Sequence, residues 1–258
     1  MAHEVYKLAN QVEDIRQKRD ESYLNSGHRT VFHDLLLSKL PQAEKSQSRL
    51  CDEAFSLVTA GSGTSSACDI SLSYFIAANP GVQQKLLNEL KEVMPRLTDH
   101  ASLQQLENLP YLDTVTREGL RLGHSVTHRL SRTFSEKALQ YRGQVIPPGT
   151  NVNMTHIFIH ENEELFPDPM VFRPERWLKN KDLHRYLLPF SKGPRSCLGI
   201  NLAWAELFLI VGTVFRRFNF DIEMVSRERD IDTAKDVVML VPRVDSPGVL
   251  VKILQNEE

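Results

Sequence analysis

Apolar residues recur at spacings of three and four through roughly the first half of the chain, a pattern that predicts amphipathic helices. Asn79-Pro80 and Pro95 mark two of the expected helix ends. Ser102 followed by Gln105 matches a capping box, which predicts the start of a short helix. We expect the longer helices over residues 1–24, 29–39, 49–78, 81–94 and 111–122.

After Gly123 the pattern changes to short runs of β-type residues separated by turns. A proline-rich, irregular region extends from Pro147 to Pro194, and such a region inside a compact domain is usually functional. An apolar helix is predicted over residues 199–215. The expected strands cover residues 126–134, 138–141, 144–146, 151–159, 218–224, 237–241 and 249–254, the fourth passing into a helical turn. This order predicts a mainly α protein with small β-sheets, of the α+β class, in which residues 1–258 form a single domain.

Composition and charge narrow the class of function. The net charge of −2 provides no strong positive field, so we expect no nucleic-acid partner. The apolar fraction of 41% and the charged fraction of 25% are those of an ordinary soluble globular protein. Cys51, Cys68 and Cys197 are odd in number and lack metal-binding spacing, which argues against a disulfide framework and favours a reducing compartment.

Two segments bear on membrane association. The polar residues 1–20 form neither a signal peptide nor a transmembrane segment. The most apolar stretch, residues 202–215, is short for a membrane span and carries Glu206 in its middle. We therefore expect that stretch to be a buried helix, and the chain by itself to be cytosolic with no anchor of its own.

The candidate chemistry is concentrated at Cys197, in the segment Phe-Ser-Lys-Gly-Pro-Arg-Ser-Cys-Leu-Gly that ends at Gly199. This cysteine lies directly before an apolar helix, whose first turn directs free amide groups and a positive dipole end at the sulfur. Each feature of the segment has a use if Cys197 binds a metal as thiolate: Gly193 and Gly199 would then let the backbone pass close to a flat macrocycle that holds the metal. Arg195 can pair with a carboxylate of that macrocycle, and Phe190 can shield the sulfur from water.

An isolated cysteine beside a helix is more often a small core residue than a ligand. Residues 190–199 as a set, however, match the haem-binding signature F-x-x-G-x-R-x-C-x-G of the cytochrome P-450 family at each defining position. The chain therefore resembles this family. The resemblance implies the C-terminal portion of the family's fold, with haem b (iron protoporphyrin IX) as the cofactor and Cys197 as the axial ligand of its iron.

Two further segments resemble motifs of the same family. Residues 118–121, Glu-Gly-Leu-Arg, resemble its E-x-x-R helix, and residues 172–177 resemble its P-E-R-F segment. From spacing alone, Glu118 and Arg121 could equally form an ordinary surface ion pair. The resemblance implies instead that Glu118, Arg121 and Arg176 form a buried structural pairing behind the haem.

The segment after this helix resembles the strand that passes the haem edge in the family. The resemblance implies that Arg132 pairs with a haem propionate, with Arg195 as the second partner. A solvated charge on the strand is the alternative for Arg132. The resemblance also implies that His124 to His128 line the substrate pocket.

Residues 60–65, Ala-Gly-Ser-Gly-Thr-Ser, resemble the family's oxygen-activation turn, A-G-x-D/E-T-T. The resemblance implies a locally unwound helix in which the Thr64 hydroxyl holds oxygen and passes protons. The chain departs from the pattern, because Gly63 occupies the position of the acid and Ser65 that of the second threonine. This departure puts the usual proton route in question. Close helix packing is the alternative role for the glycine.

A competing interpretation is a zinc hydrolase. His156 and His160 are four residues apart and are followed by Glu161 and Glu164, a spacing that could place two ligands on one helical face. The segment lacks the H-E-x-x-H order and its pattern is strand-like. We therefore disfavour a zinc site.

The resemblance covers residues 29–254 but only about half of a complete family member, and it is greatest to fungal microsomal members of secondary metabolism. It implies a haem-thiolate monooxygenase that inserts one oxygen atom of O₂ into a small apolar organic substrate. It further implies an NADPH-dependent reductase as electron donor and a location at the endoplasmic reticulum membrane. The alternative is a truncated, non-catalytic fragment or pseudoenzyme that retains the haem-binding signature.

Overall fold

The computed structural model describes residues 30–124, 126 and 128–256, together with residues 7, 10, 13–15 and 17. Most of the helix expected over residues 1–24 lies outside the described residues. The chain divides into two compact units, residues 1–63 and residues 64–258. The assignment of the whole chain to a single partial domain stays a prediction.

The first unit contains the helix α3 (Val31–Leu37), the 3₁₀ turn η1 (Gln42–Lys45) and the first part of the long helix α4 (Gln47–Ala77). Its small core consists of Ile15, Phe32, Leu50 and Ala54. The predicted helix over residues 29–39 is therefore present but shorter at both ends.

Helix α4 corrects one expectation, because it continues without a break through residues 61–64. A glycine costs a helix about 1 kcal/mol relative to alanine, but it keeps its amide donor, so the backbone ladder passes through. Ser62 adds a hydrogen bond from its Oγ to the carbonyl of Val58, at 2.7 Å. A Cβ added to Gly61 would meet no described atom within 4 Å, so this glycine does not serve close packing in the described part of the chain.

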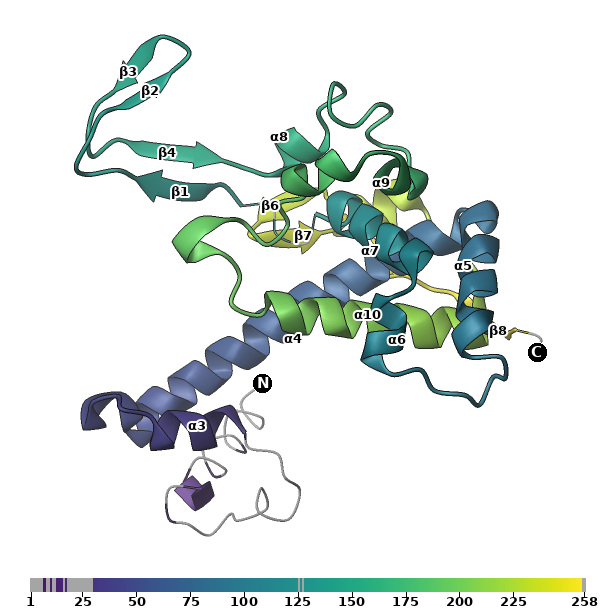
Figure 1. Cartoon of the computed structure of the whole chain (residues 1–258), viewed down its shortest axis with the longest axis horizontal. Helices are drawn as coiled ribbons and strands as arrows, with labels where there is room; N and C mark the ends of the chain where they lie inside the picture. The colour runs from purple at the N-terminus through teal and green to yellow at the C-terminus, as the bar shows by residue number, and fades with distance from the viewer. Residues whose placement is uncertain are drawn as a thin grey trace. The chain divides into compact units, whose positions relative to one another are not determined.

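The second unit is built on helices that pack around one apolar core. These are α5 (Pro80–Val93), α6 (Leu103–Glu107), α7 (Pro110–Leu122) and α10 (Ile200–Arg217), with α10 packed against the other three (Figure 1). Ser102 caps α6 through the expected capping box with Gln105. Buried Arg216 donates from Nε to the carbonyl of Met94 at 2.6 Å, which fastens the end of α10 to the end of α5.

The strands form two-stranded antiparallel sheets. The pairs are β1 (Leu130–Thr133) with β4 (Asn151–Met154), β2 (Leu139–Tyr141) with β3 (Gln144–Ile146), β5 (Phe218–Asp221) with β8 (Lys252–Gln255), and β6 (Lys235–Val237) with β7 (Met239–Val241). Figure 1 shows β1 and β4 side by side, with the β2–β3 hairpin extending from their far end. The mainly helical fold with small sheets is confirmed.

Several strand predictions were wrong in extent. The strands expected over residues 126–134, 218–224 and 249–254 run instead over Leu130–Thr133, Phe218–Asp221 and Lys252–Gln255. The expected strand over residues 237–241 is instead part of a hairpin that reverses at Val238, whose φ of 83° lies in the left-handed region. Over residues 151–159 the expected change from strand to helical turn is present: β4 ends at Met154, and the Thr155 hydroxyl accepts the Ile157 amide at 3.4 Å at the start of α8 (Ile157–His160).

After β4, the irregular region contains only short helices: α8, α9 (Glu175–Lys179), and the 3₁₀ turns η2 (Lys181–Tyr186) and η3 (Gly193–Arg195). A single π-helical turn, η4 (Arg227–Ile231), follows β5. Helix α10 buries one face, while Leu202, Leu209 and Ile210 on it are exposed. No helix among residues 30–256, as far as these are described, combines the length and apolar character that a membrane crossing requires.

Candidate functional site

Glu118 on α7 is the centre of a buried charge cluster. Its carboxylate accepts Arg121 Nη2 at 2.8 Å and Nε at 3.0 Å, and Arg176 Nε at 3.0 Å. The side chains of Glu118 and Arg121 are fully buried, and that of Arg176 on α9 is 6% exposed. The three residues singled out by the E-x-x-R and P-E-R resemblance therefore meet in the structure.

The same carboxylate binds two donors that the sequence analysis missed. Trp177 Nε1 donates to Glu118 Oε2 at 2.9 Å, and the Arg173 amide donates to Oε1 at 3.0 Å. Arg121 also donates to the carbonyls of His160 and Pro169, each at 2.7 Å. The adjacency of Trp177 to Arg176 was the only signal in the sequence for these extra contacts, since a backbone donor or acceptor leaves no mark in residue identity.

The cysteine segment folds into a loop closed by a backbone hydrogen bond from the Cys197 amide to the Phe190 carbonyl, at 2.9 Å. Inside it, η3 is a single turn in which the Ser196 amide donates to the Gly193 carbonyl at 3.0 Å. Ser191 and Gly193 have φ values of 59° and 79°, so the loop requires two left-handed positions. Cys197 is a free, exposed cysteine placed two residues before Gly199, the N-cap of α10.

Phe190 anchors the start of this loop. Its ring is half-buried against the core of the second unit and lies 6.3 Å from the ring of Trp204 on α10. Trp204 in turn stacks on Phe208 at 5.5 Å, and the Arg117 guanidinium lies 5.1 Å from the Trp204 ring centroid. The loop is thus held at its base, whereas Leu198 beside the cysteine is 91% exposed.

Arg132 and Arg195 are both exposed. Arg132 Nη2 donates to the Ser191 hydroxyl at 3.2 Å, which places this guanidinium beside the cysteine loop. Arg195 lies in η3, two residues before Cys197.

These residues fit a haem by the chemistry of the donor set. A haem needs an axial ligand, apolar contact for its face and cations for its two carboxylates. The exposed thiol of Cys197, the exposed Leu198 and the guanidinium groups of Arg132 and Arg195 offer these three features. A Cβ built on Gly193 would meet no described atom within 4 Å, so the described residues leave open the space that this glycine faces.

Thr64 lies half-buried in the middle of α4, next to Ser65. Ser65 Oγ donates to Glu206 Oε2 on α10 at 2.7 Å. Burial, with a contribution from the charge of Glu206, raises the pKa of Asp69 to about 6. Gly63 offers no carboxylate. Asp69 and Glu206 are the acids that the structure brings near Thr64 and Ser65, and the sequence did not indicate that they lie there.

His124, which follows α7, joins His156 and His160 in a cluster. The ring centroids of His156 and His160 are 4.9 Å apart, and that of His124 lies 6.2 and 6.3 Å from them. Burial lowers the pKa of His124 to about 3 and that of His156 to about 4. In the part of the chain that the structure describes, no group of three or more histidine, cysteine or acidic side chains is arranged to hold a metal ion. The geometry gives the zinc interpretation no support.

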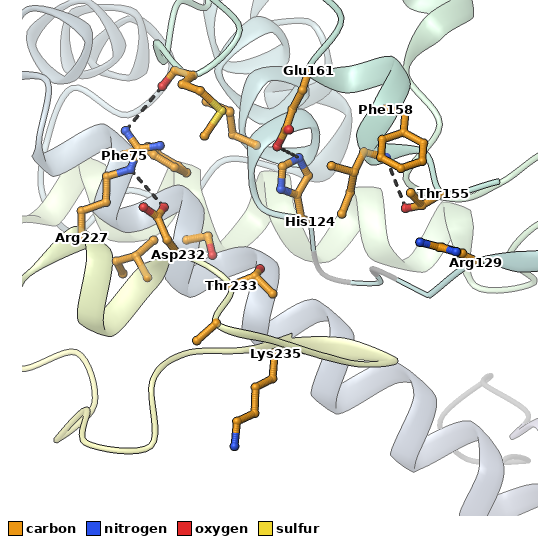
Figure 2. A pocket seen from close by; sticks show the side chains of 16 residues that line it. Phe75, His124, Arg129, Thr155, Phe158, Glu161, Arg227, Asp232, Thr233 and Lys235 are labelled. Carbon is orange, nitrogen blue, oxygen red and sulfur yellow. Dashed lines mark hydrogen bonds and ion pairs between the residues drawn. The ribbon is translucent and has the colours of Figure 1, made fainter.

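One side of His124 faces an open pocket of about 500 Å³ (Figure 2). Glu161 lies 3.8 Å from His124 Nε2 at this pocket, and Arg227 pairs with Asp232 at 3.1 Å. Arg129 also lines it. Of the segment expected to line a substrate pocket, His124 lies on this one, while residues 125 and 127 fall outside the described residues.

Comparison with known proteins identifies the family to which these motifs belong. The family model named cytochrome P450 matches residues 2–246. The chain is 38% identical to cytochrome P450 monooxygenase MO6277 of Ascocoryne sarcoides over 255 residues, which cover 96% of this chain and 50% of the relative. It is 38% identical to tryptophan 6-hydroxylase fscE of Fusarium equiseti, covering 94% and 48%. It is 40% identical to N-acetyltryptophan 6-hydroxylase ivoC of Emericella nidulans, covering 87% and 45%.

The chain thus spans about half the length of the curated relatives it matches. The family model, by contrast, covers nearly the whole of this chain. Together with the cysteine loop and the Glu118 cluster, this match shows that the chain belongs to the cytochrome P450 family.

Proposed function

We propose that this chain provides the haem-binding part of a haem-thiolate monooxygenase, with Cys197 as the axial ligand. The observation that carries the proposal is the placement of Cys197, an exposed thiol at the start of α10 in a loop anchored by Phe190. Haem b, when bound there, supplies the iron centre at which dioxygen is activated, and a thiolate ligand favours O–O cleavage.

The chain's own residues divide the remaining tasks. Arg132 and Arg195 bind and orient the propionates, and Phe190 keeps water from the sulfur. The Thr64 hydroxyl passes a proton towards the place where oxygen would bind. Gly63 occupies the position of the family's acid and has no proton to supply. Glu118, Arg121 and Arg176 hold the segment behind the haem and take no part in the chemistry.

We propose a small apolar organic substrate, oxidised with electrons from an NADPH-dependent reductase at the endoplasmic reticulum membrane. Two of the relatives are named as hydroxylases of tryptophan and N-acetyltryptophan, both compounds with an indole ring. Indole is therefore a suitable first probe for substrate binding. The other reading is a non-catalytic fragment that retains the signature, and the half-length match to the relatives keeps it in competition.

The test is the haem content of the chain purified from cells supplied with haem precursor, measured as pyridine haemochrome. We expect roughly one haem per wild-type chain and almost none in Cys197→Ala, because the axial bond is lost. Arg132→Gln and Arg195→Gln should each weaken retention only a few-fold, as exposed ion pairs contribute up to about 1 kcal/mol.

Arg142→Gln is the matched control, since Arg142 lies in the turn between β2 and β3, away from the cysteine loop in sequence. Retention of haem by Cys197→Ala would contradict the assignment of the ligand. A haem-free wild-type chain would favour the non-catalytic fragment.

A further inference from the structure

His160 connects the Glu118 cluster to the segment that leads into the cysteine loop. The residue is completely buried at the end of α8. Its backbone carbonyl accepts Arg121 Nη1 at 2.7 Å, and its ring Nε2 accepts the Leu188 amide at 2.9 Å. One residue thus binds the central arginine with its backbone and the incoming loop segment with its side chain.

Backbone hydrogen bonds continue from Leu188 to the cysteine. The Leu188 carbonyl accepts the Ser191 amide at 3.0 Å, and the Phe190 carbonyl accepts the Cys197 amide at 2.9 Å. Pro189 has no amide hydrogen, so Leu188 supplies the last amide donor before Phe190. The contact with His160 therefore fixes the chain just where the loop begins.

The direction of the Leu188 bond fixes the state of the imidazole. Because Nε2 accepts, the ring is neutral and carries its proton on Nδ1. The titratable and charged groups that act on the ring are Arg121 from α7, His124 just after it, and His156 just before α8. Burial, the two neighbouring histidines and Arg121 all lower the pKa of His160, which keeps the acceptor available.

We propose that His160 is a positioning residue for Cys197: its neutral imidazole holds Leu188 and thereby sets the start of the loop that presents the thiol. This role rests on the proposed function of Cys197 as a haem ligand. The hydrogen bonds that define it belong to the chain itself, so they can be measured on the haem-free protein.

The variants separate a hydrogen-bond acceptor from mere bulk. His160→Gln places an amide oxygen near the position of Nε2, whereas the shorter His160→Asn cannot reach Leu188. If His160→Asn does not fold, His160→Leu takes its place as the variant without an acceptor. His156→Leu is the control, because His156 belongs to the same cluster but does not bind Leu188.

Two readouts on the haem-free chain test the proposal: amide hydrogen exchange at Leu188 and Cys197 by NMR, and the rate of maleimide labelling of Cys197 followed by peptide mapping. We expect about tenfold faster exchange at Leu188 in His160→Asn, the loss that one hydrogen bond implies, together with faster labelling of Cys197. His160→Gln should recover most of the wild-type behaviour, and His156→Leu should leave both rates unchanged.

Equal rates in His160→Asn and the wild-type chain, or no recovery in His160→Gln, would overturn the proposal. A measurement on the wild-type chain does not depend on any variant folding: the ¹⁵N spectrum of His160 should show a protonated Nδ1 and an unprotonated Nε2. The opposite tautomer would also reject the role. None of these outcomes depends on haem binding, so failure here is distinguishable from failure of the proposed function.

Discussion

Glu118 accepts the hydrogen bonds that hold the buried charge cluster together. Its two oxygens accept from Arg121, Arg176, Trp177 and the Arg173 amide, all in a buried setting. If a neutral group replaced this buried carboxylate, the guanidinium groups of the two arginines would be left buried without a balancing charge. The residue is therefore a structural support for α7, α9 and the segment between α8 and α9.

Glu118→Gln tests this account of the cluster. The substitution keeps the shape but removes the charge that balances two buried guanidinium groups, and we expect a loss of about 3–5 kcal/mol in the free energy of unfolding. Denaturant titration measures it. Glu107→Gln, at the exposed end of α6, should change stability by less than about 0.5 kcal/mol. A Glu118→Gln variant as stable as this control would show that the cluster does not stabilise the fold.

The histidine cluster predicts a loss of stability in acid. The folded-state pKa values of His124 and His156 are lowered to about 3 and about 4, and that of His160 is lowered too, whereas unfolded histidine titrates near 6.5. Below pH 6.5 the unfolded chain binds protons that the folded chain does not. The stabilising contribution is therefore complete above pH 6.5 and is lost as pH falls towards 4, at about 1.4 kcal/mol per pH unit for each histidine.

Asp69 changes stability in the opposite direction. Its pKa is raised to about 6 in the folded state, so as pH falls the folded chain binds this proton before the unfolded chain does, and folding is favoured. Asp69 is present in both the wild-type chain and His124→Gln, so its contribution cancels when their pH profiles are compared. Chemical unfolding at pH 7, 6 and 5 should show a shallower pH dependence in His124→Gln than in the wild-type chain. Parallel pH profiles would mean that His124 is not held neutral in the folded state.

At the residue scale, the sequence could indicate which charged side chains meet but not all that holds them. Glu118, Arg121 and Arg176 belong to short motifs, so their identity was readable from spacing and resemblance. His160 and Leu188 meet through a ring nitrogen and a backbone amide 28 residues apart. No local pattern encodes such a pair, because one partner contributes no side-chain chemistry.

Between elements, the packing of α7 against the second half of α4 depends on Gly119. A Cβ at this position would lie 2.4 Å from Leu72 Cδ1 and 3.0 Å from Leu72 Cγ. Leu72 is completely buried, so it has no free space to move into. The glycine inside the E-x-x-R motif therefore serves the close approach of two helices.

Gly119→Ala should consequently destabilise the chain by about 1–3 kcal/mol through overpacking. The matched control is Gly61→Ala in α4, where the added methyl group would meet no described atom and the gain in helix propensity should stabilise by up to about 1 kcal/mol. Thermal unfolding of both variants measures the contrast. Two alanine variants that shift stability in the same direction would contradict the packing account.

The positions of the helices were largely readable from the sequence, and the extents of some strands were not. The pattern predicted residues 49–78 and 111–122, and the helices run from Gln47 to Ala77 and from Pro110 to Leu122. The predicted break at residues 61–64 was wrong, because the family's local unwinding was carried over from a motif whose acid is absent here. The hairpin at Val238 was missed because a β-branched residue sterically disfavours the left-handed backbone that this turn requires.

At the scale of the whole molecule, several large apolar side chains are exposed on the surface, and they should bind apolar probes. Leu198, Met224 and Val244 are 91%, 72% and 83% exposed, and Phe158 is 64% exposed. The chain also matches only about half of the length of its relatives. We expect the purified chain to bind more of an apolar fluorescent dye than a complete, well-folded domain of the family at equal concentration. Dye binding no greater than that of the control would refute this expectation.

The family was readable from ten consecutive residues, whereas the substrate was not. The haem-binding signature is local, so it survives in the sequence as a fixed spacing around Cys197. Any pocket is assembled from distant segments, as the open pocket beside His124 illustrates with residues from α4, α8 and the segment before β6. Its lining can be read only after the fold is known.

The central claim is that Cys197 is the thiolate ligand of a haem, and the most direct test is the reduced, carbon monoxide difference spectrum of the haem-supplied chain. We predict a Soret band shifted to longer wavelength in the wild-type chain and in Cys51→Ala, and its disappearance in Cys197→Ala. A shifted band that persists in Cys197→Ala would contradict the claim, and so would its absence from the wild-type chain.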